Sequence, residues 1–413
     1  MGLRRGVPAG GRRAAAMLVL SALTLLAAAG SAPASSMAIQ LPPPVIAGAR
    51  LAPAAFADLD GWAADDHAAA FATFRASCAA LRTPPAEVGP SSVATLRGGL
   101  ALACAAAARL GTSAPSKLVA RLFFEANFRP WRVIPESGTA YFTGYYEPEV
   151  EGALAPGNGF DVPVYGRPAD LVMSGSGPTP NSGGAMRRVG DALVPYFDRA
   201  AIEDGALAGR GLEIAWLKDP IDLFFMQIQG SARVRLLDGR VLRLNYDGYN
   251  GQPYVPVGRL LIARGQVPRE EMSMDRIRAF MTADPEAARL LRRENPSYVF
   301  FKALELGAEA GAMGAQGVPL TAGRSLAVDR KLHTYGAPIF VEADLPLAGP
   351  ATADPFRRLM VAQDTGSAIV GPARADLYFG TGAAAGAVAG RIRHQGRFTL
   401  LVPRLAPAPG GAP

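Results

Sequence analysis

The chain has 413 residues, of which 49% are hydrophobic and 19% are charged. This balance excludes a disordered protein, and the length favours two domains over one. The 47 glycines and 35 prolines favour short strands and turns over a helical bundle. Two cysteines and three histidines exclude a Cys-rich zinc site and an HExxH metal motif.

The positive charge is concentrated at the beginning of the chain. The formal net charge is +7, and Arg4, Arg5, Arg12 and Arg13 supply four of the cations. Without them, 38 basic side chains face 35 acidic ones, so the remainder is only mildly basic. We therefore expect no nucleic-acid partner, because nucleic-acid binding depends on a dense positive surface.

Residues 1–34 have the layout of a secretory signal peptide. The arginines precede an apolar run over residues 14–29, and small residues follow it. Sixteen residues at about 1.5 Å each are short for a bilayer core of about 30 Å, which disfavours a retained membrane anchor. No cysteine lies near the cleavage region, so we expect no lipoprotein anchor. The mature protein is thus predicted to be periplasmic, and peripheral attachment to the outer membrane stays open.

The first part of the mature chain is predicted to be a linker followed by helices. Residues 35–55 are rich in proline and alanine, which is typical of a linker. Residues 56–127 show helical patterns, and Ser116 is a candidate N-cap for the last helix. Cys78 and Cys104 fall in two alanine-rich helical patterns. In an oxidising compartment they are candidates for one disulfide, the alternative being two small buried apolar side chains.

The remainder of the chain is predicted to be mainly β. Residues 139–146 are aromatic and indicate a strand. Residues 231–237 and 240–246 flank the pair Asp238-Gly239, an arrangement typical of a hairpin closed by a type I′ turn. From residue 319 onward, short strand patterns alternate with turn residues.

Three aspartates in the C-terminal part are candidates for chemistry. Asp376 stands between apolar residues of a predicted strand, so burial should raise its pKa, as a general acid requires. The alternative is an aspartate that caps a turn or pairs with Arg374. Asp364 and Asp329 each end another apolar run. The three acids either converge on one site or are unrelated strand ends.

The triplet Asp364-Thr365-Gly366 also has the form of an aspartic-protease motif. That chemistry needs two carboxylates that share one proton, and this chain contains no second such triplet. Only a symmetric dimer could supply one. A Thr-Gly turn after a strand is the favoured interpretation.

Two segments have the composition of a ligand surface. Thr143 and Gly144 precede two tyrosines at the end of a predicted strand. Residues 226–231 are interpreted as a strand with Gln227 and Gln229 on one face. Glutamine amides and tyrosine hydroxyls can hydrogen-bond a neutral polyol, and tyrosine rings can pack on sugar C–H groups. The alternative for the tyrosines is an ordinary core position.

Together these segments resemble the lytic murein transglycosylase A (MltA) family. The match covers roughly residues 120–403. It runs in order through Thr143–Pro148, Pro195-Tyr196, Gln227–Ser231, Asn295–Phe301, Pro319-Leu320, Ser325–Asp329, Asp364–Ile369 and Asp376–Tyr378. The resemblance identifies Asp329, Asp364 and Asp376 as the acids of a three-aspartate domain.

The resemblance implies a mainly β fold with N-terminal helices. A double-psi β-barrel is interrupted by a smaller inserted β-barrel domain, and a glycan groove lies between them. We expect residues 56–147 to hold the helices and the first part of the barrel, and residues 148–305 to form the inserted domain. Residues 306–403 then complete the barrel, and residues 404–413 form a disordered tail.

The resemblance also implies a reaction. A lytic transglycosylase cleaves the β-1,4 bond between N-acetylmuramic acid and N-acetylglucosamine without water and leaves 1,6-anhydromuramoyl ends. By resemblance, Asp376 is the single catalytic acid/base, and Asp364 and Asp329 support it. The substrate-binding candidates are Thr143, Gly144, Tyr145, Gln227, Gln229, Gly230 and Ser231.

The implied partner is the peptidoglycan glycan strand, and we expect a monomer without metal or cofactor. Two alternatives stay open. One is a hydrolase that uses two carboxylates, and the other is a peptidoglycan-binding module without catalysis.

Overall fold

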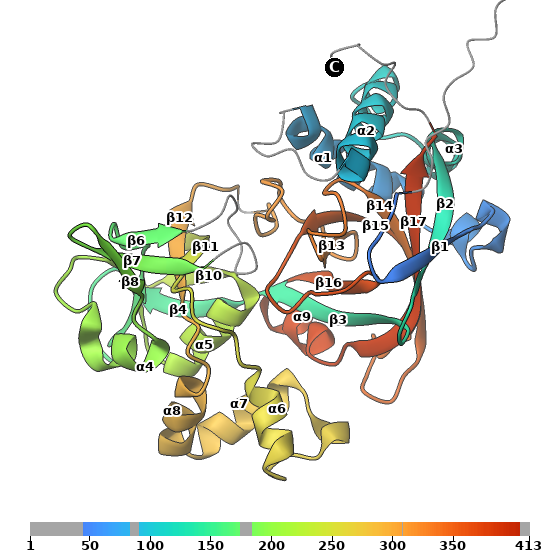
Figure 1. Ribbon diagram of the computed structural model, residues 1–413. Helices are drawn as coiled ribbons and strands as arrows, with labels where there is room; N and C mark the ends of the chain where they lie inside the picture. Colours follow the sequence, from blue (N-terminus) through green and yellow to red (C-terminus); the bar gives the residue numbers. More distant parts are fainter. Residues whose placement is uncertain (1–43, 83–90, 174–183, 308, 405–413) are drawn as a thin grey trace, which may run out of the picture. The chain divides into compact units, whose positions relative to one another are not determined.

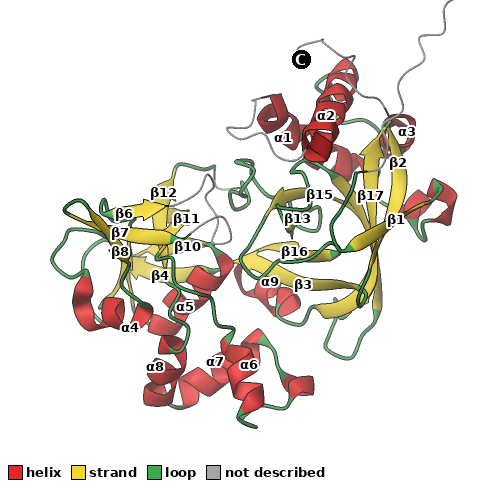
Figure 2. Ribbon diagram, viewed as in Figure 1, coloured by secondary structure: helices red, strands yellow, loops and turns green. Residues whose placement is uncertain are grey.

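The computed structural model describes residues 44–82, 91–173, 184–307 and 309–404. The predicted signal peptide lies outside these residues. So does the predicted tail at residues 404–413, except for Arg404, whose amide donates to the carbonyl of Asn127 at 2.8 Å. Strands gather in two groups, and helices lie around them (Figures 1 and 2). The predicted fold class, a mainly β protein with N-terminal helices, is confirmed.

Three helices cover one end of the group of strands at the right of Figure 1. They are α1 (His67–Arg82), α2 (Ser91–Arg109) and α3 (Lys117–Asn127), preceded by single turns at Phe56–Asp58 and Trp62–Ala64. Ser116 caps α3 as predicted, because its side chain accepts a hydrogen bond from the amide of Val119. Phe71 and Phe123 pack edge to face between α1 and α3, with ring centroids 4.9 Å apart.

Two covalent or ionic links hold these helices in place. A disulfide joins Cys78 on α1 to Cys104 on α2, with Cα atoms 5.5 Å apart. Just before α1, the buried carboxylate of Asp65 pairs with Arg324 at 2.8 Å. Asp65 also accepts a hydrogen bond from the amide of Leu359 at 2.7 Å. The helices are therefore tied both to each other and to the strands beneath them.

Six strands close into a barrel. Their cyclic order is β17 (Arg393–Pro403), β14 (Pro338–Leu345), β15 (Asp354–Asp364), β13 (Ser325–Val328), β16 (Arg374–Thr381) and β3 (Ala140–Glu147), which pairs again with β17. Pairs β13–β15 and β16–β3 are parallel. Helix α9 (Gly382–Ala389) packs on β3 and β16. Closure leaves these six strands without a free edge.

The predicted linker at residues 35–55 is wrong for its last residues. Strand β1 (Ala49–Pro53) pairs antiparallel with β2 (Phe128–Pro135), which in turn pairs with β17. Proline and alanine have low strand propensity, so the pattern did not predict this pairing. Edge strands tolerate proline, however, and Pro53 ends β1.

The segment between β3 and β13, which we call the inserted domain, contains a six-stranded sheet and a smaller sheet. The order of the first is β12 (Val299–Leu304), β11 (Val241–Tyr249), β10 (Ser231–Leu236), β4 (Glu149–Ala153), β9 (Glu213–Leu217) and β5 (Val162–Tyr165). A bridge between Gly166 and Phe301 joins its two edges. The small sheet contains β6 (Leu171–Met173), β7 (Ala185–Val189) and β8 (Ala192–Pro195).

Helices flank the strands of the inserted domain (Figure 1). They are α4 (Arg199–Ala201), α5 (Pro220–Gln229), α6 (Val257–Ala263), α7 (Met274–Ala283) and α8 (Pro285–Arg293), with single turns at Ile202–Ala206 and Arg269–Glu271. The predicted hairpin is present as β10 and β11. Its predicted type I′ turn is wrong, because that turn needs two positive φ angles and only Gly239 has one.

The predicted strand at residues 226–231 is also wrong, because residues 226–229 end helix α5, Gly230 follows as its C-cap, and only Ser231 is in a strand, as the first residue of β10. Asp219 caps the helix by accepting from the amide of Ile221, and Pro220 occupies its first turn. Gly230 ends it with φ +79°, a left-handed conformation that suits glycine. The signals at both ends of the segment outweigh the alternation inside it.

Both chain crossings between the two domains meet at Glu147, which ends β3 and is 1% exposed. Its carboxylate accepts hydrogen bonds from Arg233 at 2.9 Å, from Arg243 at 3.0 Å and from the hydroxyl of Thr381 at 2.9 Å. Arg243 also donates to the carbonyl of Ala310, on the returning segment, at 3.0 Å. One buried ionic cluster therefore connects the barrel, the inserted domain and the return crossing.

In the described part of the chain, no helix has both the length and the apolarity needed to span a bilayer.

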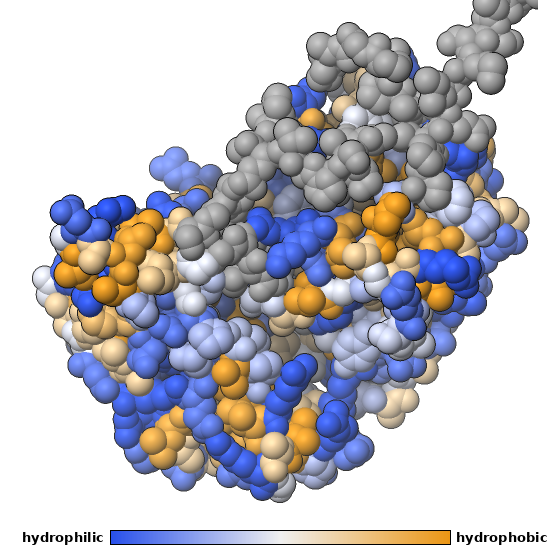
Figure 3. All heavy atoms as spheres, viewed as in Figure 1, coloured by the Kyte–Doolittle hydropathy of each residue, from blue (hydrophilic) through white to orange (hydrophobic). Residues whose placement is uncertain are grey.

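Hydrophilic and hydrophobic residues are interspersed on the face shown in Figure 3, and hydrophobic residues gather over the small sheet at its left. That sheet exposes Val189 and Leu193 by about half.

We expect Glu147→Gln to lower the free energy of unfolding by about 3–5 kcal/mol. The substitution leaves the buried charge of Arg243 and the partly buried charge of Arg233 without their counter-ion. Chemical denaturation at neutral pH measures the change. The matched control is Glu151→Gln, which breaks a solvent-exposed pair with Lys218 and should change stability little. Equal effects of the two variants would contradict the prediction.

Candidate active site

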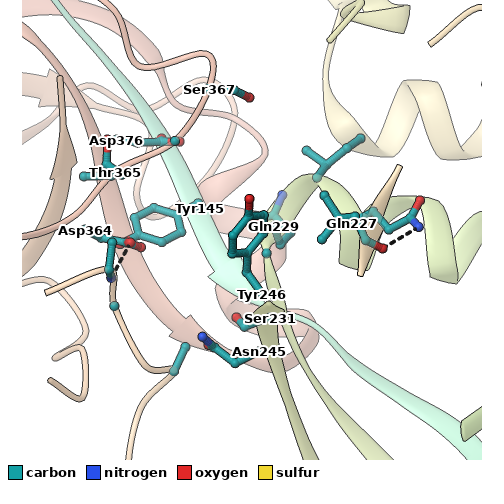
Figure 4. A pocket seen from close by; sticks show the side chains of 18 of the residues that line it. Tyr145, Gln227, Gln229, Ser231, Asn245, Tyr246, Asp364, Thr365, Ser367 and Asp376 are labelled. Carbon is teal, nitrogen blue, oxygen red and sulfur yellow. Dashed lines mark hydrogen bonds between the residues drawn. The ribbon is translucent and has the colours of Figure 1, made fainter. Parts of the chain in front are cut away.

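A pocket of about 490 Å³ lies between the barrel and the inserted domain. Eight of the residues predicted from the sequence line it, namely Gly144, Tyr145, Gln227, Gln229, Gly230, Ser231, Asp364 and Asp376. Figure 4 shows the two walls: Tyr145, Asp364, Thr365 and Asp376 belong to the barrel, and Gln229, Ser231, Asn245 and Tyr246 to the inserted domain. Two of the three candidate aspartates therefore share one pocket.

Asp376 enters the pocket from β16. In the sheet register it lies opposite Thr143 on β3 and Ala327 on β13. The hydroxyl of Thr143 donates to Oδ1 of Asp376 at 2.6 Å. Among the described residues, Oδ2 of Asp376 receives no hydrogen bond. Burial raises the pKa of Asp376, while the charge of Arg374 and the bond from Thr143 oppose that rise.

Asp364 lies at the end of β15, with both carboxylate oxygens engaged. Oδ1 accepts a hydrogen bond from the amide of Ala315 at 2.9 Å, and Oδ2 accepts one from the hydroxyl of Tyr145 at 3.0 Å. Burial raises the pKa of Asp364 to about 6, although these donors act against it. Asp364 thus anchors Tyr145 and the loop around Ala315.

Asp329 does not line the pocket. Its Oδ1 accepts a hydrogen bond from the amide of Lys331 and its Oδ2 one from the amide of Gly371, each at 3.0 Å. These bonds join the turn after β13 to the segment before β16. The three acids therefore do not converge: Asp329 stabilises the loops, and only Asp364 and Asp376 face the cavity.

Thr143 and the two glutamines make hydrogen bonds within the protein that the sequence did not predict. Thr143 bonds to Asp376 and is not among the residues that line the pocket. Gln227 is buried, accepts a hydrogen bond from Arg199 at 2.7 Å and donates to the carbonyl of Val299 at 3.1 Å. Gln229 accepts a hydrogen bond from the amide of Tyr146 at 3.1 Å. The glutamines thus stabilise the pocket wall from within.

Other residues that line the pocket were missed in the sequence, namely Arg199, Asn245, Tyr246, Tyr254, Lys302, Thr365 and Ser367. Arg199 is the least predictable of them, since it is 2% exposed and donates to the carbonyls of Asn295 at 3.0 Å and Ser297 at 2.6 Å. Burial lowers its pKa to about 10. No local signal marks a buried arginine, because its acceptors lie 28, 96 and 98 residues away.

The arrangement suits acid/base chemistry on a neutral polar substrate. It combines a carboxyl of raised pKa with hydroxyls, amides and aromatic faces in one cleft. Among the described residues, no group of three or more His, Cys, Asp or Glu side chains could hold a metal ion.

Two known domains match this chain in the same order as the structural units. The MltA specific insert domain matches residues 141–302, and the 3D domain matches residues 324–402.

Curated relatives support the same assignment. The membrane-bound lytic murein transglycosylase A of Vibrio cholerae is 38% identical over 269 residues, which make up 64% of this chain and 66% of the relative. The protein of that name from Escherichia coli is 35% identical over 278 residues, which make up 66% of this chain and 68% of the relative. The chain thus spans about two thirds of the length of these relatives.

Solved structures agree over more of the chain. A membrane-bound lytic murein transglycosylase from Agrobacterium tumefaciens matches with a TM-score of 0.75 and 37% identity, over 86% of this chain and 97% of that one. E. coli MltA with bound chitohexaose matches with a TM-score of 0.61 and 28% identity, over 90% of this chain and 97% of that one.

We expect Asp364→Asn to become more stable relative to the wild type as the pH rises. The folded-state pKa of about 6 lies above the ordinary aspartate pKa of 3.8, so the carboxyl favours folding below pH 4 and loses that contribution between pH 4 and 6. The difference in unfolding free energy between the variant and the wild type should grow by up to about 3 kcal/mol over this window. Denaturant titrations at pH 4, 5, 6 and 7 measure it, and a flat difference would refute the assignment.

Proposed function

The chain belongs to the membrane-bound lytic murein transglycosylase A family and is a peptidoglycan lytic transglycosylase, and we propose that Asp376 is its single acid/base. The pocket supports this role because it holds Asp376 in a partly desolvated position with one oxygen open to a ligand. A protonated carboxyl near neutral pH is what the first step requires.

The proposed reaction has two proton transfers through the same side chain. Protonated Asp376 donates its proton to the glycosidic oxygen as the bond from C1 of N-acetylmuramic acid to that oxygen breaks. The resulting carboxylate then takes the proton of the C6 hydroxyl of the same sugar, and the C6 oxygen bonds to C1. The products are a 1,6-anhydromuramoyl end and a free N-acetylglucosamine hydroxyl, and Asp376 is protonated again.

The nucleophile belongs to the substrate, so a second catalytic carboxylate is unnecessary. The hydrogen bonds around the two acids support this distinction. Asp364 has both oxygens occupied by protein donors, whereas within the described residues Asp376 has a donor on Oδ1 alone. A two-carboxylate hydrolase would need Asp364 free to activate water.

We place the glycan strand along the pocket between the two domains. A related structure carries chitohexaose, a chain of sugars with the same β-1,4 geometry as peptidoglycan. Ser231 and Gln229 lie on the wall opposite Asp376 and offer hydroxyl and amide groups to sugar hydroxyls. Tyr246 on the same wall offers an aromatic face to sugar C–H groups. Gly144 and Gly230 contribute backbone to the wall, and Gly144 has no room for a side chain because a Cβ there would lie 2.7 Å from Cα of Ala389.

We further propose that the mature protein is periplasmic and has no lipid anchor. The names of the relatives place those proteins at a membrane. Here both cysteines of the sequence are joined in a disulfide, so neither offers a thiol for lipid attachment. Any attachment to the outer membrane is then peripheral.

We expect Asp376→Ala to lower the release of anhydromuropeptides at least about a thousandfold, because the only acid/base is lost. Glycan binding should persist, since Gln229 and Ser231 stay in place. Mass spectrometry of digested sacculi measures the products, and pull-down with sacculi measures binding. Circular dichroism must show that the variant is folded.

Asp364→Asn is the matched control for this experiment, since it neutralises the neighbouring acid and retains hydrogen-bonding groups. Its loss should be smaller, about tenfold. Equal, severe losses in both variants, together with reducing ends from the wild type, would favour the hydrolase. A wild type that binds sacculi and releases nothing would favour the binding module. An active, folded Asp376→Ala protein would refute the assignment.

We expect high salt and carbonate to release the mature protein from envelope membranes, because charge and peripheral contacts would hold it there rather than acyl chains. Fractionation followed by immunoblotting checks this. Protein that stays in the pellet after both washes would contradict the absence of a lipid anchor.

A further inference from the structure

Arg374 lies beside the proposed acid/base without touching it. It precedes Asp376 by two positions on β16, so both side chains leave the same face of the strand. Its Nη2 donates to the hydroxyl oxygen of Thr143 at 2.6 Å, and that hydroxyl donates to Asp376 at 2.6 Å. Its Nη1 donates to the carbonyl of Ala375, and its guanidinium lies 5.6 Å from the ring centre of Tyr141.

This arrangement determines where the Thr143 hydrogen points. A hydroxyl has one hydrogen and two lone pairs. Because the guanidinium donates to the oxygen of Thr143, the hydroxyl hydrogen is directed away from the cation and toward Oδ1 of Asp376. With Oδ1 held as an acceptor, the acidic proton of Asp376 is left to Oδ2, the oxygen that receives no bond from the described residues.

We propose that Arg374 is a positioning residue for the transglycosylase reaction, and that it orients and tunes Asp376 through the hydroxyl of Thr143. The proposal rests on the proposed function of Asp376. It adds a charged partner that makes no contact with the substrate-facing oxygen, so that the acid has its proton on one defined oxygen.

Other ionisable groups surround Asp376 without taking this role. On β3 they are Tyr141 and Tyr145, on β16 Tyr378, at the end of β15 Asp364, before α6 Tyr254, and on β17 Arg393 and His394. Arg393 directs its guanidinium to backbone carbonyls at Arg269, Glu270 and Met272. Of the described residues, Arg374 is the cation that lowers the pKa of Asp376 against the effect of burial.

The sign of the effect follows from this charge. A neighbouring cation favours the carboxylate, so its removal raises the pKa of Asp376. General-acid activity declines as the pH rises above that pKa. Removing Arg374 should therefore move the alkaline decline of the rate to higher pH. A residue that only supported the fold would lower the rate without moving the decline.

The test compares Arg374→Met, which keeps the apolar stem, with Arg374→Lys, which keeps the charge. For Arg374→Met we expect a fall in kcat of about tenfold or more, the size of one charge-assisted hydrogen bond, with KM little changed. The alkaline decline of the rate of Arg374→Met should move to higher pH. Arg374→Lys should show the alkaline decline at the wild-type pH and recover part of kcat. If Arg374→Met does not fold, we expect the same move of the alkaline decline in Arg374→Gln.

Arg391→Met is the matched control, because Arg391 also donates to backbone carbonyls on the barrel, at Pro346 and Leu347. It removes the same charge and should leave the profile unchanged. An equal shift in Arg391→Met, or no shift in Arg374→Met, overturns the proposal.

A second readout separates this inference from the proposed function. Titration of ¹³C-labelled aspartate carboxyls by NMR, with Asp376→Asn to assign the signal, reports the Asp376 pKa without turnover. A higher pKa in Arg374→Met supports the relay even if the wild type releases no anhydro ends. An unchanged pKa in an active enzyme refutes the relay alone.

Discussion

The buried carboxylate of Glu147 is the constraint on which the pocket depends. It lies where β3 leaves the barrel, and Arg233 and Arg243 reach it from the inserted domain. Burying the charges of Glu147 and Arg243 is costly unless each is paired and hydrogen-bonded, so few arrangements of the two domains are tolerated. Because Arg243 also bonds to the returning chain at Ala310, both crossings are held at one point. The two walls of the pocket therefore keep a defined relation although they come from distant parts of the chain.

Within the pocket, burial and hydrogen bonding have separate consequences. Burial raises the pKa of both Asp364 and Asp376, so burial alone does not separate their roles. Their hydrogen bonds do: Asp364 is held at both oxygens, and Asp376 at one. An acid that must give and take a proton needs an open oxygen, and an acid that anchors a loop does not. The proposed relay from Arg374 through Thr143 has a matching consequence, because it leaves the acidic proton of Asp376 on Oδ2.

Errors in the sequence interpretation share one physical cause. The segment predicted as a strand, residues 226–231, belongs mostly to helix α5, because the helix cap at Asp219 lies outside the segment, and Gly230 within it ends the helix. The linker prediction missed β1, whose pairing with β2 joins residues about 80 positions apart. Asp329 has the same local pattern as Asp364, yet its acceptor bonds go to loops away from the pocket. Local composition does not report which distant segment a strand end will face.

The proposal of Asp376 as the acid comes from the likeness to the family. The sequence by itself determined the mainly β class, the cap of α3 and the hairpin of β10 and β11. These features depend on residue type and short spacing, which act over a few positions. Only the tertiary structure decided that Thr143 bonds to Asp376, that Gln227 holds the buried Arg199, and that one oxygen of Asp376 is open. Each of these depends on the register of β16 against β3 or on the packing of the inserted domain. This register and this packing result from long-range contacts, in which side-chain partners are separated by tens to hundreds of residues.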